Sequence, residues 1–112
     1  AYILSERKNS SKVDFNYALQ LAERAVAMEP ENAAFLDTIG WIYYKLETYQ
    51  KAEEFIEKSL NYNEDNPVIL EHLGDIYVKR NKTIEAINIY EKLLEKDSNN
   101  QLIRNKLDKI ND

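Results

Sequence analysis

Residues 36–43 read LDTIGWIY, and residues 70–77, which lie 34 positions later, read LEHLGDIY. The two stretches share Leu, Gly, Ile and Tyr at equivalent positions. The same interval relates four further sets: Ala18, Ala52 and Ala86; Phe35, Ile69 and Ile103; Ile39, Leu73 and Leu107; and Ile42, Ile76 and Ile110. A period of this length is typical of helix hairpins that stack along one axis. The sequence therefore predicts an all-α solenoid of antiparallel helix hairpins.

Short polar stretches divide the chain into about seven predicted helices. The first helix is expected to end near residue 8, and the polar residues 9–14 predict a loop before a second helix over about 15–28. The remaining helices are expected over about 33–45, 49–61, 67–80, 83–96 and 101–110. Asn32, Thr48 and Asn66 precede three of them and are expected to cap their N-termini.

The repeat organises the whole chain as one domain. We expect a partial first repeat over 1–32, full repeats over 33–66 and 67–100, and a capping helix over 101–112. Arg104 and Asp108 stand in the last helix where the full repeats have Leu and Gly. A polar outer face is typical of a terminal repeat, so the array is expected to end there.

Two glycines predict how the helices pack. Gly40 and Gly74 lie inside predicted helices, where glycine costs about 0.5–1 kcal/mol relative to alanine. We therefore expect a neighbouring helix to come too close for a Cβ at these positions, with Ala52 and Ala86 lying opposite.

Charge and hydropathy exclude several classes of partner. The net charge is −5, and residues 31–66 carry eight acidic and three basic side chains. Nucleic acid is not an expected partner because no basic stripe is present. Membrane insertion is not expected, since no apolar run approaches the roughly 20 residues that span a bilayer. The charged run over 51–58 is expected to be solvent exposed. The chain has no signal peptide and begins in what reads as the middle of a helix, so we expect a fragment without any targeting segment, of unknown compartment.

No motif indicates catalysis. Cysteine is absent, and the sequence has neither a Gly-rich phosphate loop nor a His-Glu-x-x-His motif. His72 is the only histidine and has no second histidine to share a metal. No pair of carboxylates stands in an apolar context that would favour proton transfer. We therefore expect no enzyme activity, no cofactor and no metal ion.

The repeat resembles the tetratricopeptide repeat family. The first full repeat carries the residues that define the family pattern: Leu36, Ile39, Gly40, Tyr43, Ala52, Ile56 and Ser59. The second carries Leu70, Leu73, Gly74, Tyr77, Ala86, Tyr90 and Leu93. Glu64 and Ser98 replace the closing proline, and Glu47 and Asn81 stand where a turn glycine is common. The sequence of residues 37–44 resembles that of bacterial members of the family.

The resemblance implies that a peptide or protein segment binds in a concave groove lined by the first helix of each hairpin. The positions that it assigns to partner binding are Tyr2, Asp37, Trp41, Tyr44, Lys45, Glu71, His72, Asp75, Val78 and Lys79, with further contributions from Ser5, Asn105 and Lys109. The implied role is that of a non-catalytic scaffold or adaptor.

One subfamily of the family that this chain resembles binds acidic chain ends with Lys, Asn and Arg side chains on this face. This chain does not have those residues at the corresponding positions. Asp37, Glu71 and Asp75 would repel an acidic ligand. We therefore expect a neutral or basic ligand, with an apolar anchor near Trp41 and Tyr44. Aromatic residues are frequent interface hot spots, although these two rings could equally serve only to pack neighbouring helices.

Two other functions remain open at this point. The apolar residues Tyr2, Ile3 and Leu4 favour a structural or self-association module, which would make the fragment a homodimer. The chain could also be a domain appended to a larger enzyme.

Overall fold

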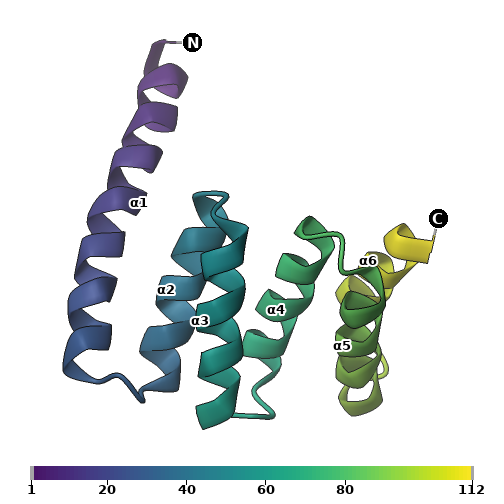
Figure 1. Cartoon of the computed structure of the whole chain (residues 1–112). Coiled ribbons are helices and arrows are strands. Elements are labelled where there is room, and N and C mark those ends of the chain that lie inside the picture. The colour runs from purple at the N-terminus through teal and green to yellow at the C-terminus, as the bar shows by residue number, and fades with distance from the viewer. Residues whose placement is uncertain (1, 112) are drawn as a thin grey trace.

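The computed structural model describes the backbone of residues 2–111 and the side chains of residues 14–110. The described backbone forms six α-helices and no strands. They are α1 (Tyr2–Met28), α2 (Ala33–Lys45), α3 (Tyr49–Tyr62), α4 (Pro67–Lys79), α5 (Thr83–Lys96) and α6 (Gln101–Asn111). Each helix packs mainly on its neighbours in chain order, and α1 and α6 lie at opposite ends of the row (Figure 1).

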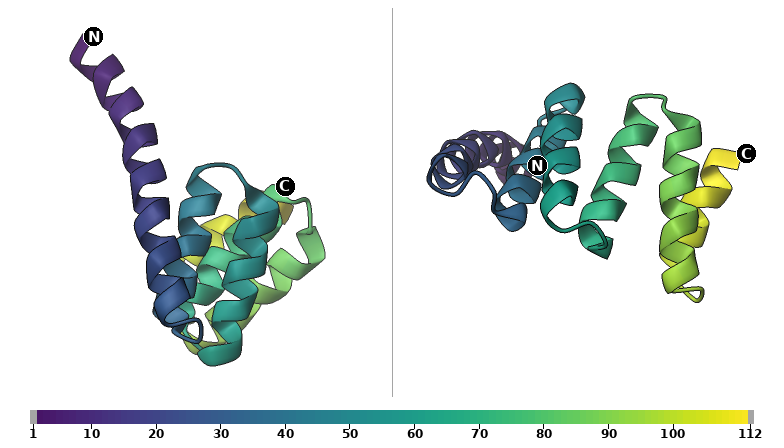
Figure 2. Two further views of the ribbon diagram at one scale, coloured as in Figure 1. Left: turned by 60° about the vertical axis from the view of Figure 1, so that its left-hand side comes forward. Right: turned by 60° about the horizontal axis from the view of Figure 1, so that its bottom comes forward.

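The predicted loop at 9–14 is wrong, and the chain has six helices rather than about seven in its described part. A single helix, α1, runs through these residues, and its N-terminal part extends beyond the ends of the other helices (Figures 1 and 2). The segment 2–28 contains neither glycine nor proline. Ser and Asn in a helix cost less than about 0.7 kcal/mol each, so a polar run without a helix breaker need not end one.

The other helix boundaries agree with the prediction to within two residues. Two of the expected caps act as predicted, whereas Thr48 precedes α3 without a capping hydrogen bond from its side chain. The Asn32 Oδ1 atom accepts a hydrogen bond from the Phe35 amide at 3.0 Å. The Asn66 Oδ1 atom accepts from the amides of Val68 and Ile69 at 2.9 and 3.2 Å. Both side chains satisfy donors that the first turn of a helix leaves free.

The turns within the two full hairpins form without glycine. Glu47 and Asn81 adopt positive φ angles of 62° and 61°. This is the left-handed conformation that glycine adopts most easily. The family resemblance therefore located both turns correctly, although neither carries the usual residue.

The buried residues form a series of clusters between successive helices. Ala22, Ile39 and Ile42 join α1 to α2. The second cluster joins α3 to α4 and contains Ala52, Ile56, Ile69, Leu73 and Ile76. The third joins α4, α5 and α6 and contains Leu70, Ala86, Tyr90, Leu93 and Ile103. Each cluster takes its fully buried residues from two or three successive helices, as expected for a solenoid.

The charged run at 51–58 is only partly exposed, which corrects the expectation from the sequence. Glu53 is buried, and its Oε2 atom accepts a hydrogen bond from the Lys82 ammonium at 2.7 Å. Arg80 approaches the other carboxylate oxygen at 3.5 Å. The carboxylate on α3 thus contacts the α4–α5 turn of the next hairpin, where opposite charges compensate for its burial.

Both glycines stand where another helix leaves no room for a side chain. A Cβ at Gly40 would lie 2.7 Å from the Ile56 side chain and 3.2 Å from the Ala52 carbonyl oxygen. A Cβ at Gly74 would lie 2.6 Å from the Tyr90 ring. The expected close approach is confirmed, but the nearest atoms belong to Ile56 and Tyr90 rather than to the alanine side chains.

Replacing Gly74 with alanine should destabilise the chain more than the same change at Gly40. A Cβ at Gly74 would meet the rigid, hydrogen-bonded ring of Tyr90 at 2.6 Å, whereas the closest atoms at Gly40 belong to the aliphatic Ile56 side chain at 2.7 Å. Overpacking costs about 1–3 kcal/mol, and alanine recovers about 0.5–1 kcal/mol of helix propensity. Urea unfolding should therefore show a net loss of up to about 2.5 kcal/mol for Gly74→Ala. Equal effects in the two variants would contradict this assignment.

Candidate functional site

Two side-chain clusters and one pocket lie along the face shared by α2, α4 and α6. The aromatic cluster consists of Trp41, Tyr44 and His72. The Trp41 ring stacks with Tyr44 at a centroid distance of 4.4 Å and an angle of 7°, and with His72 at 3.9 Å and 16°. His72 comes from α4, so these stacked rings connect two successive hairpins.

Two charged residues complete the surroundings of the aromatic cluster. The Nδ1 atom of His72 lies 2.8 Å from the Asp37 Oδ1 atom. The Lys45 ammonium lies 5.0 Å from the centre of the Trp41 ring, within the range of a cation–π interaction. All these side chains are at least partly accessible, so Trp41 and Tyr44 are neither sealed inside the stack nor isolated from neighbours.

The ion cluster connects α4 to α6 and consists of Glu71, Asp75, Lys106 and Tyr90. The Lys106 ammonium lies 2.7 Å from Glu71 Oε2 and 2.9 and 3.0 Å from the two oxygens of Asp75. The Tyr90 hydroxyl on α5 donates a hydrogen bond to Asp75 Oδ1. Both carboxylates are therefore paired within the fold.

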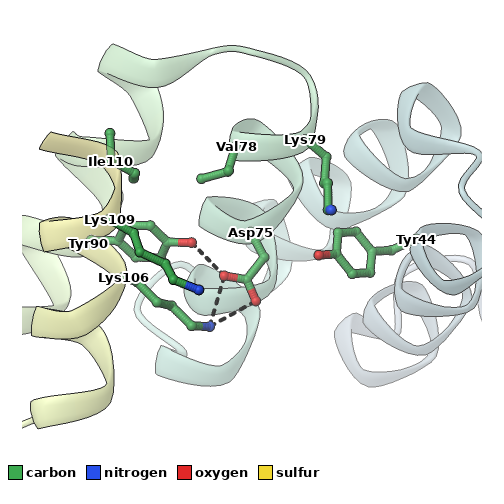
Figure 3. Close-up of a pocket in the computed structure, with 8 residues that line it drawn as sticks. All are labelled: Tyr44, Asp75, Val78, Lys79, Tyr90, Lys106, Lys109 and Ile110. Carbon is green, nitrogen blue, oxygen red and sulfur yellow. Dashed lines mark hydrogen bonds and ion pairs between the residues drawn. The ribbon is translucent and has the colours of Figure 1, made fainter. Parts of the chain in front are cut away.

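A pocket of about 340 Å³ opens beside the ion cluster. Its lining comes from four helices and consists of Tyr44, Asp75, Val78, Lys79, Tyr90, Lys106, Lys109 and Ile110 (Figure 3). Figure 3 shows the ammonium groups of Lys106 and Lys109 on one side of Asp75 and the ring of Tyr44 on the other. The pocket thus combines aliphatic and aromatic walls with several charged groups, as ligand sites commonly do.

The lining of this pocket carries three lysines and one carboxylate. Lys106 is engaged by Glu71 and Asp75. Among the side chains that the structure describes, Lys79 and Lys109 have no carboxylate within 4.0 Å. Positive charge is therefore available in the pocket, although the whole chain is acidic.

Burial and hydrogen bonding fix the protonation of three groups around the pocket. Burial, the hydrogen bond to Asp75 and the charge of Asp75 all raise the pKa of the Tyr90 hydroxyl. Burial and the Asp75 charge raise the pKa of Tyr44. Partial burial lowers the pKa of Lys106, but the hydrogen bonds and charges of Glu71 and Asp75 outweigh burial, and the net shift is upward. At neutral pH both phenols can donate, and Lys106 is cationic.

The comparisons with known proteins agree with the repeat architecture. A family model described as "Anaphase-promoting complex, cyclosome, subunit 3" matches residues 11–100. The chain belongs to this family of tetratricopeptide repeats. The family assignment drawn from the repeated Leu, Gly, Tyr and Ala positions is thereby confirmed.

Solved structures of tetratricopeptide repeats share the fold closely. The first such domain of Spaghetti (RPAP3), bound to HSP90 peptide SRMEEVD, has a TM-score of 0.83 at 22% identity, covering 98% of this chain and 89% of that one. The second domain of human RPAP3, in complex with HSP70 peptide SGPTIEEVD, has a TM-score of 0.80 at 20% identity, covering 96% and 92%. A thermophilic protein of Thermus thermophilus has a TM-score of 0.78 at 25% identity, covering 91% and 52%.

One curated relative also matches. "BBSome complex member BBS4" from Bos taurus is 36% identical over 59 residues, which are 53% of this chain and 11% of the relative's length. The expected likeness to bacterial members in particular is not confirmed, because human, bovine and bacterial proteins are all among the matches.

The structure brings together most of the tetratricopeptide positions that were assigned to partner binding. Four of them line the pocket: Tyr44, Asp75, Val78 and Lys79, together with Lys109 from α6. Asp37, Trp41, Lys45 and His72 form or flank the aromatic cluster, and Glu71 belongs to the ion cluster. The side chains of Tyr2 and Ser5, and those of Ile3 and Leu4 on which self-association was expected to depend, lie outside the described residues. Asn105 accepts a hydrogen bond from Gln101 and does not line the pocket.

Three pocket residues were missed by the sequence analysis. Tyr90 occupies a core position of the repeat, but a buried tyrosine hydroxyl needs a partner, and here that partner is Asp75. Lys106 follows Glu71 by 35 residues, as His72 follows Asp37, so the repeat itself carried the signal. Ile110 was identified only as the repeat equivalent of Ile42 and Ile76, and it borders the pocket.

Neither a metal site nor a membrane span is found in the described part of the chain. Residues 14–110 contain no group of three His, Cys, Asp or Glu side chains placed to hold a metal ion. The described helices include none that is long and apolar enough to cross a membrane.

Stability should fall at alkaline pH because the pKa values of Tyr44, Tyr90 and Lys106 are raised in the folded chain. Their contribution is complete below the ordinary values near 10 and is lost as the pH rises towards the folded values. Urea unfolding between about pH 8 and pH 11 should therefore show a declining free energy of unfolding. The decline should be shallower in Tyr90→Phe, which has no hydroxyl to ionise.

The matched control for this titration is Tyr17→Phe, which changes an exposed tyrosine on α1. Tyr17→Phe should keep the slope of the parent chain. An unchanged slope in Tyr90→Phe would show that the Tyr90–Asp75 contact does not control the proton affinity of Tyr90.

Proposed function

We propose that this chain is a non-catalytic protein–protein interaction module that holds a segment of another protein along α2, α4 and α6. The observation that carries the proposal is the open pocket between these helices, which offers aliphatic and aromatic walls beside the ammonium groups of Lys79 and Lys109. The aromatic cluster continues from Tyr44 at the edge of the pocket and would contact the same segment.

The fold neighbours support this type of function. Spaghetti (RPAP3) and human RPAP3 bind short peptides through domains of the same fold. Their sequence identity to this chain is too low to transfer a ligand, so the support extends to segment binding and not to those peptides. Their domains also support a role without catalysis, such as an adaptor or scaffold.

The expectation of a neutral or basic ligand is not supported. It assumed that Asp37, Glu71 and Asp75 face the ligand unpaired, whereas His72 and Lys106 pair with them. The two peptides bound by the neighbouring structures, SRMEEVD and SGPTIEEVD, are also acidic, which conflicts with that expectation. Segment binding can be tested without assuming a charge for the ligand.

Peptides selected from a random heptapeptide library on the immobilised chain should depend on Val78. Val78 is 41% exposed in the pocket, while Ile84 is 73% exposed at the start of α5 and lines none of the pockets described. Isothermal titration should show at least about tenfold weaker binding to Val78→Gln, which corresponds to about 1.4 kcal/mol. The matched variant Ile84→Gln should bind as the parent chain does.

Two results would contradict the proposal. One is a selection that yields no peptide above background. The other is equal binding of the selected peptides to Val78→Gln and the parent chain, which would place their site elsewhere.

Self-association is the second candidate function, because Tyr17, Leu21 and Met28 are exposed apolar residues on α1. Leu21 is equivalent to Phe55 and Ile89, and Phe55 stacks with Tyr43 of its own hairpin. A second copy of the chain could pack a side chain on the exposed face of α1, as Tyr43 packs on Phe55 within the hairpin. Sedimentation velocity distinguishes the two candidates, since a monomer at all concentrations would exclude a homodimer.

A further inference from the structure

We infer that two copies of this chain pair through the exposed face of α1, with their α1 helices antiparallel and related by a two-fold axis. The pairing rests on self-association, the second candidate function, and it specifies the contact surface and the relative direction of the two helices. Four features of α1 support it: a hairpin face that is incompletely covered, a stripe of exposed residues at heptad spacing, small residues beside that stripe, and complementary charges along it.

The hairpin face of α1 is less well covered than the same face of the other second helices. The repeat makes α1 equivalent to α3 and α5, because Ala18, Ala52 and Ala86 occupy the same position. Ala52 and Ala86 are fully buried, whereas Ala18 is partly accessible. The backbone before Ala18 continues straight as α1 and does not fold back as a first helix (Figure 1). In the described part of the chain, the hairpin face of α1 therefore has no first helix packed on it.

Five exposed residues of α1 form one narrow stripe along the helix. Asp14, Tyr17, Leu21, Arg24 and Met28 follow one another at alternating intervals of three and four residues, and all five are exposed. This alternation is the spacing at which one helix packs along another in a coiled coil. Three of the five side chains are large and apolar. The stripe therefore has the pattern of a helix–helix interface.

Small residues border the stripe on the side of the hairpin face. Ala18 and Ala25 are only partly buried, whereas their equivalents in α3, Ala52 and Ser59, are fully buried. The distance between two packed helices depends on the size of the side chains at their contact. A second helix could therefore come close to α1 along this edge.

The charges along the stripe favour antiparallel helices. Asp14 lies at one end and Arg24 towards the other, and Tyr17 and Leu21 lie between them. A two-fold axis between antiparallel helices places Asp14 of each copy opposite Arg24 of the other copy, and Tyr17 opposite Leu21. Parallel helices would place Asp14 opposite Asp14 and Arg24 opposite Arg24. Like charges that face each other across an interface are unfavourable.

The same residues select one antiparallel register. In this register the helices overlap over residues 10–28 of both copies, which is about 28 Å at 1.5 Å per residue. A shift by one heptad in one direction would place Arg24 opposite Leu21. A shift in the other direction would place Asp14 opposite Tyr17. Only the inferred register matches charge with opposite charge and encloses an apolar centre, which is the usual arrangement of an interface with a polar rim.

Pairing through α1 leaves the pocket between α4 and α6 free. No residue of α1 lines that pocket, and α1 and α6 lie at opposite ends of the row of helices (Figure 1). The dimer would therefore carry two copies of the pocket. Two ligand segments joined in one partner would then bind with a higher apparent affinity than either segment alone.

Sedimentation velocity over a range of concentrations tests the pairing through exchanged charges. The parent chain should form a reversible dimer. Asp14→Arg and Arg24→Asp should each weaken the dimer by at least about tenfold, because each places like charges opposite each other at both ends of the contact. The double variant Asp14→Arg/Arg24→Asp should restore the dissociation constant of the parent, because the two charges only change places.

Two further variants control for the total charge and for the apolar centre. Glu23→Arg makes the same change of charge as Asp14→Arg at an exposed position of α1 outside the stripe, so it should dimerise as the parent does. Leu21→Gln should weaken the dimer by at least about tenfold. Circular dichroism should show that every variant is folded, which is expected because all the changed side chains are exposed.

The outcomes separate the pairing from the self-association on which it rests. If the parent chain stays monomeric at all concentrations, self-association itself fails. If folded Leu21→Gln dimerises as the parent does, self-association stands and the role of α1 is overturned. If Leu21→Gln weakens the dimer but the double variant does not restore it, the antiparallel register is overturned.

Discussion

The close approach of paired helices at Gly40 and Gly74 is the constraint on which the rest of the structure depends. The Ile56 side chain and the Tyr90 ring occupy the space that a Cβ would take. The two helices of each full hairpin can therefore pack closely together. The next hairpin can then stack on them with the same geometry. Because the first helices of successive repeats are then aligned, side chains 35 residues apart meet on one face. The same packing directs the Tyr90 hydroxyl to Asp75, which connects the core to the candidate site.

Pairing between repeats gives this face an electrostatic character that differs from that of the whole chain. The sequence has a net charge of −5, yet the Lys106 ammonium on the following repeat compensates Glu71 and Asp75, and Asp37 lies within hydrogen-bond distance of His72. Lys79 and Lys109 then leave the pocket with an excess of positive charge. Local pairing decides what a ligand would meet there, because screening limits the influence of charges more than about 8–10 Å away.

Periodicity and capping residues predicted most of the fold because they act through local geometry. The repeat interval, the caps at Asn32 and Asn66 and the turns at Glu47 and Asn81 are all visible in the sequence and confirmed in the structure. The N-terminal helix was mispredicted because polar residues alone were taken to end a helix in a segment that has no glycine or proline. Family resemblance correctly indicated which helices would share a face.

The contacts between repeats were harder to predict, because each depends on two side chains far apart in the sequence. The pairing of Lys106 with Glu71 and Asp75 and the burial of Glu53 against Lys82 required knowledge of how the hairpins stack. Counting charges along the chain treated these carboxylates as exposed and led to the expectation of a neutral or basic ligand. The interval of 35 residues between acid and base was present in the sequence. It indicates a contact between the two side chains only when the stacking of the hairpins is known.

The most direct test of this account is an NMR measurement of where a bound peptide lies on the chain. Nuclear Overhauser contacts should connect the methyl groups of Val78 and Ile110 to the aliphatic side chain of a selected peptide, because both residues line the pocket between α4 and α6. Contacts from the peptide to Leu21 on α1 or Ile84 on α5, with none to Val78 or Ile110, would contradict the account.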